Sequence, residues 1–156
     1  HVVAATKQPL LINKYEHKAR LAFQYAGLHI VGSTQADGTL CRTTIDSMGW
    51  MLMQTIGYKN RLLTLAATAA YFRTHDYDSR LYAYERGLLY SFSSTMFYGK
   101  GMRGTIFGRV DIGKTVMMIC KVGLTKYFDR DHISSSYQRI DKSYMADMSV
   151  QLRLKF

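Results

Sequence analysis

The last nine residues of the chain, 148–156, alternate strictly between apolar and polar side chains. Because successive side chains on a β-strand point to opposite faces, this segment predicts a strand with one apolar face and one polar face. In a soluble protein the apolar face packs into a core, whereas in an outer-membrane β-barrel it meets lipid and the polar face lines the lumen. The apolar positions of this C-terminal strand are Met148, Val150, Leu152, Leu154 and Phe156.

The composition favours a sheet protein. The 156 residues are 47% hydrophobic and include 12 Tyr, 7 Phe and 12 Gly but a single Pro, as expected for strands with aromatic girdles. No apolar run is long enough for a transmembrane helix. We therefore expect residues 1–156 to form one β-barrel domain, or the C-terminal fragment of a larger barrel.

Alternating patterns recur along the chain and predict an antiparallel transmembrane β-barrel of about eight strands. Longer loops are expected at 35–47 and 128–147, and tight turns at 58–61 and 113–114. Counted back from the C-terminus, these assignments put the two tight turns on opposite sides of the sheet. In a barrel of this kind we expect the tight turns at the same side, so the number of strands around 35–61 (the strand parity) requires a bulge or an extra short strand there. The alternating segments are 18–33 with a kink at Gly27, 50–58, 61–72, 81–97, 103–112 and 116–127.

Positive charge gathers on the polar faces of these strands, and the chain has a formal net charge of +10. A lumen lined in this way would favour anionic cargo, including DNA, although no nucleic-acid motif is present. Equally, the cations could pair with Glu85 and Asp111 and simply fill a narrow barrel. The basic residues are Arg20, Arg103, Arg109, Lys121, Arg153 and Lys155.

Four stretches, 76–85, 98–101, 129–133 and 151–156, together resemble one known family in their order and spacing. They read Asp-Tyr-Asp-Ser-Arg-Leu-Tyr-Ala-Tyr-Glu, Tyr-Gly-Lys-Gly, Asp-Arg-Asp-His-Ile and Gln-Leu-Arg-Leu-Lys-Phe. The family comprises Bacteroidota outer-membrane barrels with helix-hairpin-helix modules near the N-terminus. The resemblance covers residues 60–156 and implies the C-terminal barrel segment of a longer protein. The helix-hairpin-helix module has no counterpart here, so a role with DNA rests on analogy alone.

A phosphate-loop pattern, G-x-x-x-x-G-K-[ST], occurs at residues 108–115. Phosphate binding by this motif needs a preceding strand and a following helix, whose amides and dipole hold the anion. Here the alternation of a strand continues through the motif, and the next segment is β-branched rather than helical. We interpret Gly113-Lys114 as a hairpin turn, and we expect no nucleotide cofactor.

A cluster of Asp129, Asp131 and His132 lies in the long loop. Carboxylates beside a His can activate water, as in a hydrolase, but Asp residues in solvated loops commonly make turns. No spacing of His and Cys predicts a metal site.

The sequence therefore predicts an integral protein of the bacterial outer membrane that acts as a pore, a scaffold or a subunit of an envelope complex, without enzymatic activity. Its expected partners are outer-membrane lipid, the barrel-assembly machinery and other envelope subunits. Two alternatives stay open: an outer-membrane hydrolase that uses the loop residues, and a soluble basic β protein that binds nucleic acid.

Overall fold

A computed structural model describes residues 15–42, 46–91, 94–113, 115–131, 133 and 142–154. Over these ranges the prediction of an all-β fold is confirmed. A search of the same ranges finds no helix with the length and apolarity to span a membrane. The strands are β1 (Tyr15–Ala26), β2 (Ile30–Arg42), β3 (Ser47–Lys59), β4 (Leu63–Thr74), β5 (Leu81–Tyr84), β6 (Ser94–Phe97), β7 (Lys100–Ile112), β8 (Val116–Tyr127) and β9 (Tyr144–Leu154).

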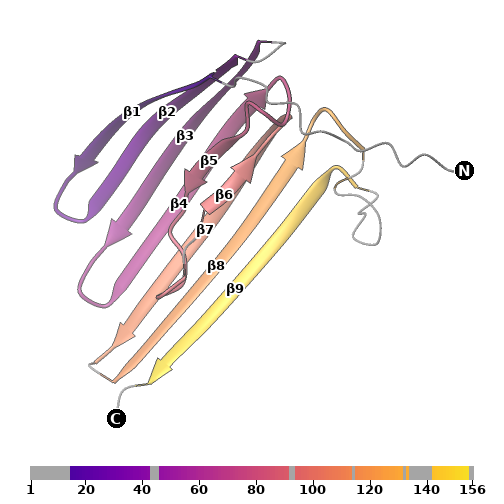
Figure 1. Cartoon of the computed structure of the whole chain (residues 1–156). Helices are drawn as coiled ribbons and strands as arrows, with labels where there is room; N and C mark the ends of the chain where they lie inside the picture. The colour runs from indigo at the N-terminus through magenta and orange to yellow at the C-terminus, as the bar shows by residue number, and fades with distance from the viewer. Residues whose placement is uncertain are drawn as a thin grey trace, which may run out of the picture.

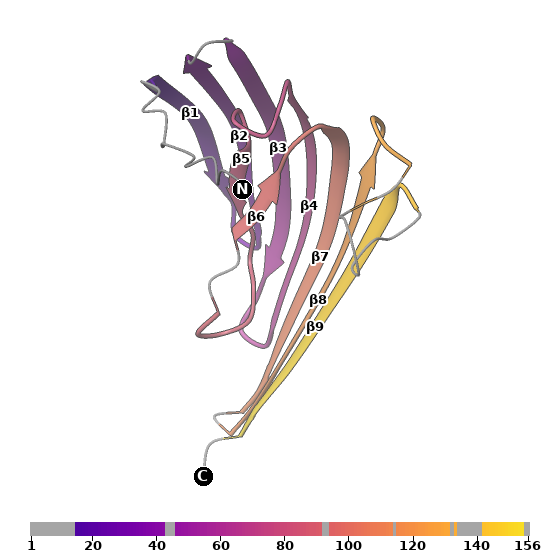
Figure 2. The ribbon, with the colours of Figure 1, turned by 45° about the vertical axis from the view of Figure 1, so that its right-hand side comes forward.

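Seven long strands lie side by side in one antiparallel sheet, in the order β1-β2-β3-β4-β7-β8-β9 (Figure 1). β5 and β6 pair with each other in a separate small sheet. Within the described residues the large sheet is open, with β1 and β9 at its edges. It is curved, and β5 and β6 lie on its concave side (Figure 2).

The connection between β4 and β7 is here called the inward connection. Its described residues, 75–91 and 94–99, leave the sheet and fold onto its concave face. The predicted continuous strand over 81–97 is wrong, because β4 pairs directly with β7 and only two short strands form between them. Leu88 and Leu89 of this connection pack on the concave face, which draws the chain inward. Because the predicted strand over 81–97 is not part of the large sheet, the tight turns before β4 and after β7 lie at the same end of the sheet. The bulge or extra strand expected around 35–61 is therefore unnecessary.

The predicted single strand over 18–33 is also wrong. The chain reverses at 27–29, where the amide of Gly27 donates to the carbonyl oxygen of Ile30 at 2.7 Å. Gly27 therefore begins a tight turn between β1 and β2. The neighbouring apolar residues concealed this turn in the sequence, because they continue the strand pattern on both sides of it.

The predicted loop over 35–47 is wrong for a different reason. β2 runs to Arg42 and β3 begins at Ser47, so most of this segment is strand. Its polarity comes from the face it occupies, because Asp37 on the concave side accepts hydrogen bonds from Arg20 and Gln35. A polar strand face was mistaken for a loop.

The two ends of the sheet differ. Tight turns join β1 to β2, β3 to β4 and β7 to β8 at one end, here called the tight-turn end. The two longest connections, from β4 to β7 and from β8 to β9, join strand ends at the other end of the sheet, here called the loop end. The second is shorter than the predicted loop over 128–147, because the alternation of β9 extends back to Tyr144.

The alternation of side chains separates the sheet into two unlike faces. On β7 every second residue from Gly101 to Phe107 is buried on the concave side, and the residues between them are exposed on the convex side. The C-terminal strand follows the same rule, although Lys155 and Phe156 lie outside the described residues. Exposed apolar residues of the convex face include Met102, Ile106, Met118, Val122, Leu124, Met148, Val150, Leu152 and Leu154.

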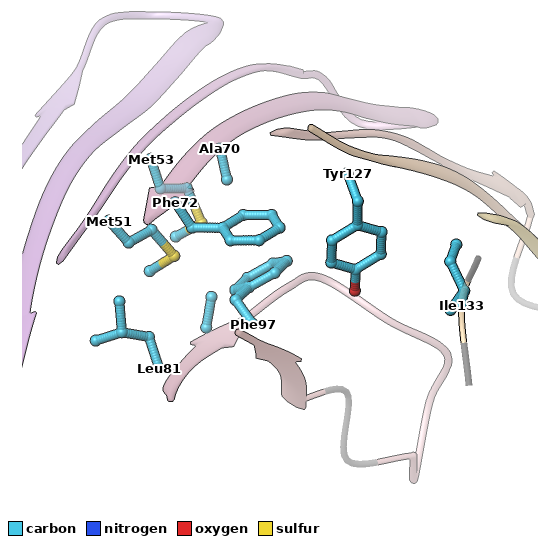
Figure 3. Close-up of a cluster of buried hydrophobic side chains, with 9 residues drawn as sticks. Met51, Met53, Ala70, Phe72, Leu81, Phe97, Tyr127 and Ile133 are labelled. Carbon is cyan, nitrogen blue, oxygen red and sulfur yellow. The ribbon is translucent and has the colours of Figure 1, made fainter. Parts of the chain in front are cut away.

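A hydrophobic core fills the space between the concave face and the small β5–β6 sheet (Figure 3). Phe72 of β4 is fully buried, and its ring stacks on Phe97 of β6 at 4.6 Å and meets Tyr127 of β8 edge-on at 5.8 Å. This cluster joins residues far apart in the sequence, and it fastens the small sheet to the large one. The cluster comprises Met51, Met53, Ala70, Phe72, Leu81, Ala83, Phe97, Tyr127 and Ile133.

We expect Phe72→Ala to lower the free energy of unfolding by about 3–5 kcal/mol, because it removes a buried ring and leaves a cavity between the two sheets. Chemical denaturation followed by the emission of Trp50 measures this loss. Leu28→Ala, at a turn residue that is 93% exposed, is the matched control and should change stability by less than about 0.5 kcal/mol. Equal losses in the two variants would contradict this account of the core.

Candidate functional site

Of the basic residues predicted to share one face, those that the structure describes, Arg20, Arg103, Arg109, Lys121 and Arg153, lie on the concave face of the sheet. Arg103 lies on β7, nearer to the loop end of that strand, with a side chain that is only 4% exposed. The neighbouring strand leaves room for it at Gly123. A Cβ atom added to Gly123 would lie 2.5 Å from Nη2 of Arg103 and 2.7 Å from Oδ1 of Asp147. Glycine on β8 therefore lets the guanidinium reach across to β9.

The guanidinium of Arg103 makes five hydrogen bonds. Nε and Nη2 donate to the two carboxylate oxygens of Glu85 at 2.6 and 3.1 Å. Nη1 and Nη2 donate to the two oxygens of Asp147 at 2.7 and 3.1 Å, and Nη1 also donates to Oγ1 of Thr125 at 2.8 Å. Such bidentate pairs are the strongest contacts that Arg makes with carboxylates. Arg103 therefore ties the inward connection to both β8 and β9.

Glu85 is the residue of the inward connection that completes this network. Its side chain is 3% exposed and also forms an ion pair with Lys121 of β8 at 2.8 Å. Burial alone raises the pKa of this carboxyl, but hydrogen bonds and charge from Arg103 and Lys121 outweigh that effect and hold the pKa below its usual value. Glu85 is thus a buried anion fastened by two cations of the sheet.

A second ion pair fastens the N-terminal edge of the sheet to the same inward segment. Arg20 of β1 faces Asp37 of β2 in register, and its Nε donates to Oδ1 of Asp37 at 2.7 Å. Nη2 of Arg20 also donates to the backbone oxygen of Tyr82 at 3.3 Å. Arg20 is half-exposed, so this contact is weaker than the network around Arg103.

The other predicted cations of this face lie toward the tight-turn end. Arg109 is paired with Asp111 two residues along β7, through hydrogen bonds of 2.8 and 2.9 Å. Arg153 of β9 has its guanidinium carbon 5.7 Å from the ring centre of Tyr90. Lys155 lies outside the described residues. The structure thus divides the cations into a paired central group and a group near the tight turns.

The structure brings the loop residues together only in part. Nε and Nη2 of Arg130 donate to the two carboxylate oxygens of Asp129 at 3.0 and 2.8 Å. Burial favours the neutral form of Asp129, but Arg130 outweighs it and lowers the pKa of this carboxyl. Asp131 follows in the same loop, and His132 lies outside the described residues. Asp129 is therefore engaged in a structural ion pair.

Two contributors to the site were missed by sequence reasoning. Asp147 was assigned to the loop, although it continues the polar alternation of Ser149 and Gln151 on β9. Arg86 was hidden within the segment interpreted as a continuous aromatic strand. The signal that could have found Asp147 is the period of two, which extends back to Tyr144.

Comparison with known proteins leaves the function to be inferred from the structure. No family model, curated protein or solved structure matches this chain. Across the residues that the structure describes, no group of three or more His, Cys, Asp or Glu side chains is placed to hold a metal ion. The most developed polar site of the described chain is therefore the concave face with its fastened inward segment.

We expect Glu85→Gln to destabilise the protein by about 3 kcal/mol, because it leaves Arg103 and Lys121 buried with less compensating charge. Hydrogen exchange at residues 81–91 should accelerate in the variant, since these residues lose their ionic attachment to the sheet. Glu16→Gln removes a carboxylate that pairs with Lys18 on the exposed edge strand, and it is the matched control. An unchanged exchange rate in Glu85→Gln would contradict the fastening role.

The pH dependence of this attachment follows from the lowered pKa of Glu85. Because the folded pKa lies below the unfolded one, the stabilisation is fully present above the usual Glu value of about 4.3 and is lost as the pH falls through the folded pKa. The native protein should therefore keep the segment protected at pH 5 and resemble Glu85→Gln only in more acidic solution.

Proposed function

We propose that this chain forms the wall of a bacterial outer-membrane β-barrel and that its inward connection occludes the lumen. The convex face would meet lipid, and the concave face would enclose water and polar side chains. In this role the protein is an occluded pore, a scaffold or a subunit of an envelope complex, and the proposal assigns it no catalytic step. Its partners would be outer-membrane lipid and the machinery that inserts barrels.

The observation that carries this proposal is the convex face itself. Large apolar side chains stand exposed on every strand of the large sheet, while the ion pairs of the wall gather on the opposite face. Soluble proteins seldom expose a continuous apolar patch larger than a few hundred Å². Hydrocarbon on the convex side accounts for this surface across the whole sheet.

The lengths and ends of the strands support the same environment. The long strands have 11–13 residues, which suits an oblique crossing of a bilayer. Aromatic residues on the convex side lie near both ends of the sheet, where girdles form at membrane interfaces. Tyr15, Trp50 and Tyr144 lie toward the loop end, and Tyr25 and Tyr58 lie toward the tight-turn end.

Barrel closure requires strands beyond the seven in this sheet. β1 and β9 both run from the loop end to the tight-turn end, so direct pairing of these edges would be parallel. An antiparallel barrel therefore needs an odd number of further strands, and the smallest barrels have about eight strands in all. Two copies in the same orientation would still place β9 of one beside β1 of the other in parallel. This parity is consistent with the resemblance to the C-terminal part of a larger outer-membrane barrel.

The inward connection sets the expected transport behaviour. Residues 81–91 and 94–97 lie over the concave face and are fastened there by the Phe72 cluster and by Glu85. A lumen filled in this way conducts little, as expected of a plugged barrel rather than an open porin. The proposed barrel is therefore closed at rest.

The protein should be extracted from membranes only by detergent, and it should migrate differently on gels before and after heating. Trp50, the single tryptophan, gives a sharper test because it lies on the convex face near the loop end. In vesicles, lipids brominated close to the headgroup should quench its emission more than lipids brominated near the chain end. Quenching by aqueous acrylamide with no effect of brominated lipid would overturn the proposal.

A further inference from the structure

The concave face carries an excess of positive charge next to the tight turns. Two adjoining cavities of about 520 and 470 Å³ open there. Arg61, Arg109 and Asp111 line both of them. Arg86 lines the smaller cavity and Arg153 the larger. These two cavities are here called the basic basin.

The cations of the basin differ from those at the centre of the face. Arg103, Lys121 and Arg20 are paired with carboxylates, so the centre is neutralised. Within the described chain, by contrast, Arg61, Arg86 and Arg153 have no carboxylate partner. Asp111 is the one acidic side chain that lines the basin, and it is already paired with Arg109.

Local structure holds these cations at the cavity. Arg61 is at the tip of the tight turn between β3 and β4, where Oδ1 of Asn60 accepts hydrogen bonds from the amides of Leu62 and Leu63 at 2.8 and 2.9 Å. Arg86 directly follows Glu85, whose ion pairs with the sheet fix the chain at that point. The turn and the buried anion therefore fix the backbone at two residues whose unpaired guanidinium groups line the basin.

The segment after Arg86 borders both cavities, since Gly87 lines the smaller one and Leu89 the larger. The amide of Leu89 donates to Oε1 of Gln151 on β9 at 2.8 Å, which attaches the segment to the sheet. Tyr90 has a φ of +62°, a backbone conformation that is rare for a bulky residue, and its ring is 88% exposed beside Arg153. Each of the two adjoining cavities has the volume of a small-molecule site.

We propose that the basic basin binds a small, multiply charged phosphate compound through Arg61, Arg86 and Arg153. Planar guanidinium groups match the geometry of phosphate oxygens and keep their charge at every physiological pH. A threaded polymer fits less well, because the inward connection covers the concave face beyond the basin. The inference rests on the proposed function, since it requires a concave face that is open to water at the tight-turn end.

Calorimetric titration with inorganic pyrophosphate tests the basin in the full chain folded in detergent micelles. We expect a single saturable site whose affinity falls as salt is raised. Each of Arg61→Gln, Arg86→Gln and Arg153→Gln should weaken binding by about ten-fold, the loss expected for a charge-assisted hydrogen bond. Arg73→Gln removes the same charge from the loop end of β4, outside the basin, and should leave the affinity within about two-fold.

Asp111→Asn should change the affinity for pyrophosphate in the opposite direction. It removes the one carboxylate of the basin and should tighten pyrophosphate binding, which a variant that merely misfolds would not do. Absence of binding, or an equal loss in Arg73→Gln, would overturn the inference. Tighter binding of a short single-stranded oligonucleotide than of pyrophosphate would overturn the assignment to a small ligand.

The outcomes also separate this inference from the proposed function. Quenching of Trp50 by brominated detergent in the same micelles reports whether the convex face is covered by hydrocarbon. Quenching without pyrophosphate binding would reject the basin alone. Absence of quenching would reject the barrel, whatever the titration gives.

Discussion

The whole structure depends on one geometric constraint, the alternation of side chains across seven strands held in fixed register. Arg20 faces Asp37, and Thr105 faces Gly123, which in turn faces Asp147, so polar partners meet on one side of the sheet. A slip of one residue in any strand would move its charges to the convex face and its apolar residues to the concave one. The separation of a charged inner face from an apolar outer face therefore fixes the register, and the register places every ion pair.

The inward connection determines which parts of the concave face are covered and which parts keep unpaired charge. Hydrophobic contact with Phe72 and ionic contact through Glu85 fasten the same segment at two points. The carboxylate of Glu85 neutralises Arg103 and Lys121, and the chain that follows it borders the cationic end of the face. Occlusion of the lumen and the proposed anion site thus share a cause, namely the path that residues 81–91 take across the sheet.

Sequence reasoning succeeded where alternation is uninterrupted and failed where a polar face or an inward segment imitates another element. The predicted strands at 61–72, 103–112 and 116–127 correspond closely to β4, β7 and β8. Gly27 was interpreted as a kink within one strand rather than as a turn, and the polarity of β2 resembled a loop. The path of the inward connection depends on tertiary contacts such as that of Glu85 with Arg103, which neither a strand pattern nor a turn signal reveals. Arg109 and Arg153 of the basin were predicted from the alternation, whereas Arg61 and Arg86 were missed because they belong to a turn and to that inward segment.

The most direct test of the account compares two neighbouring residues of β7 that face opposite sides. In a Trp50→Phe background, a single tryptophan placed at Ile106 would lie on the exposed convex face, and one placed at Phe107 would lie on the buried concave face. In vesicles, lipids brominated in the middle of the acyl chain should quench the emission of Ile106→Trp strongly and that of Phe107→Trp weakly. Equal quenching at the two positions, or none at Ile106→Trp, would contradict the assignment of the convex face to hydrocarbon.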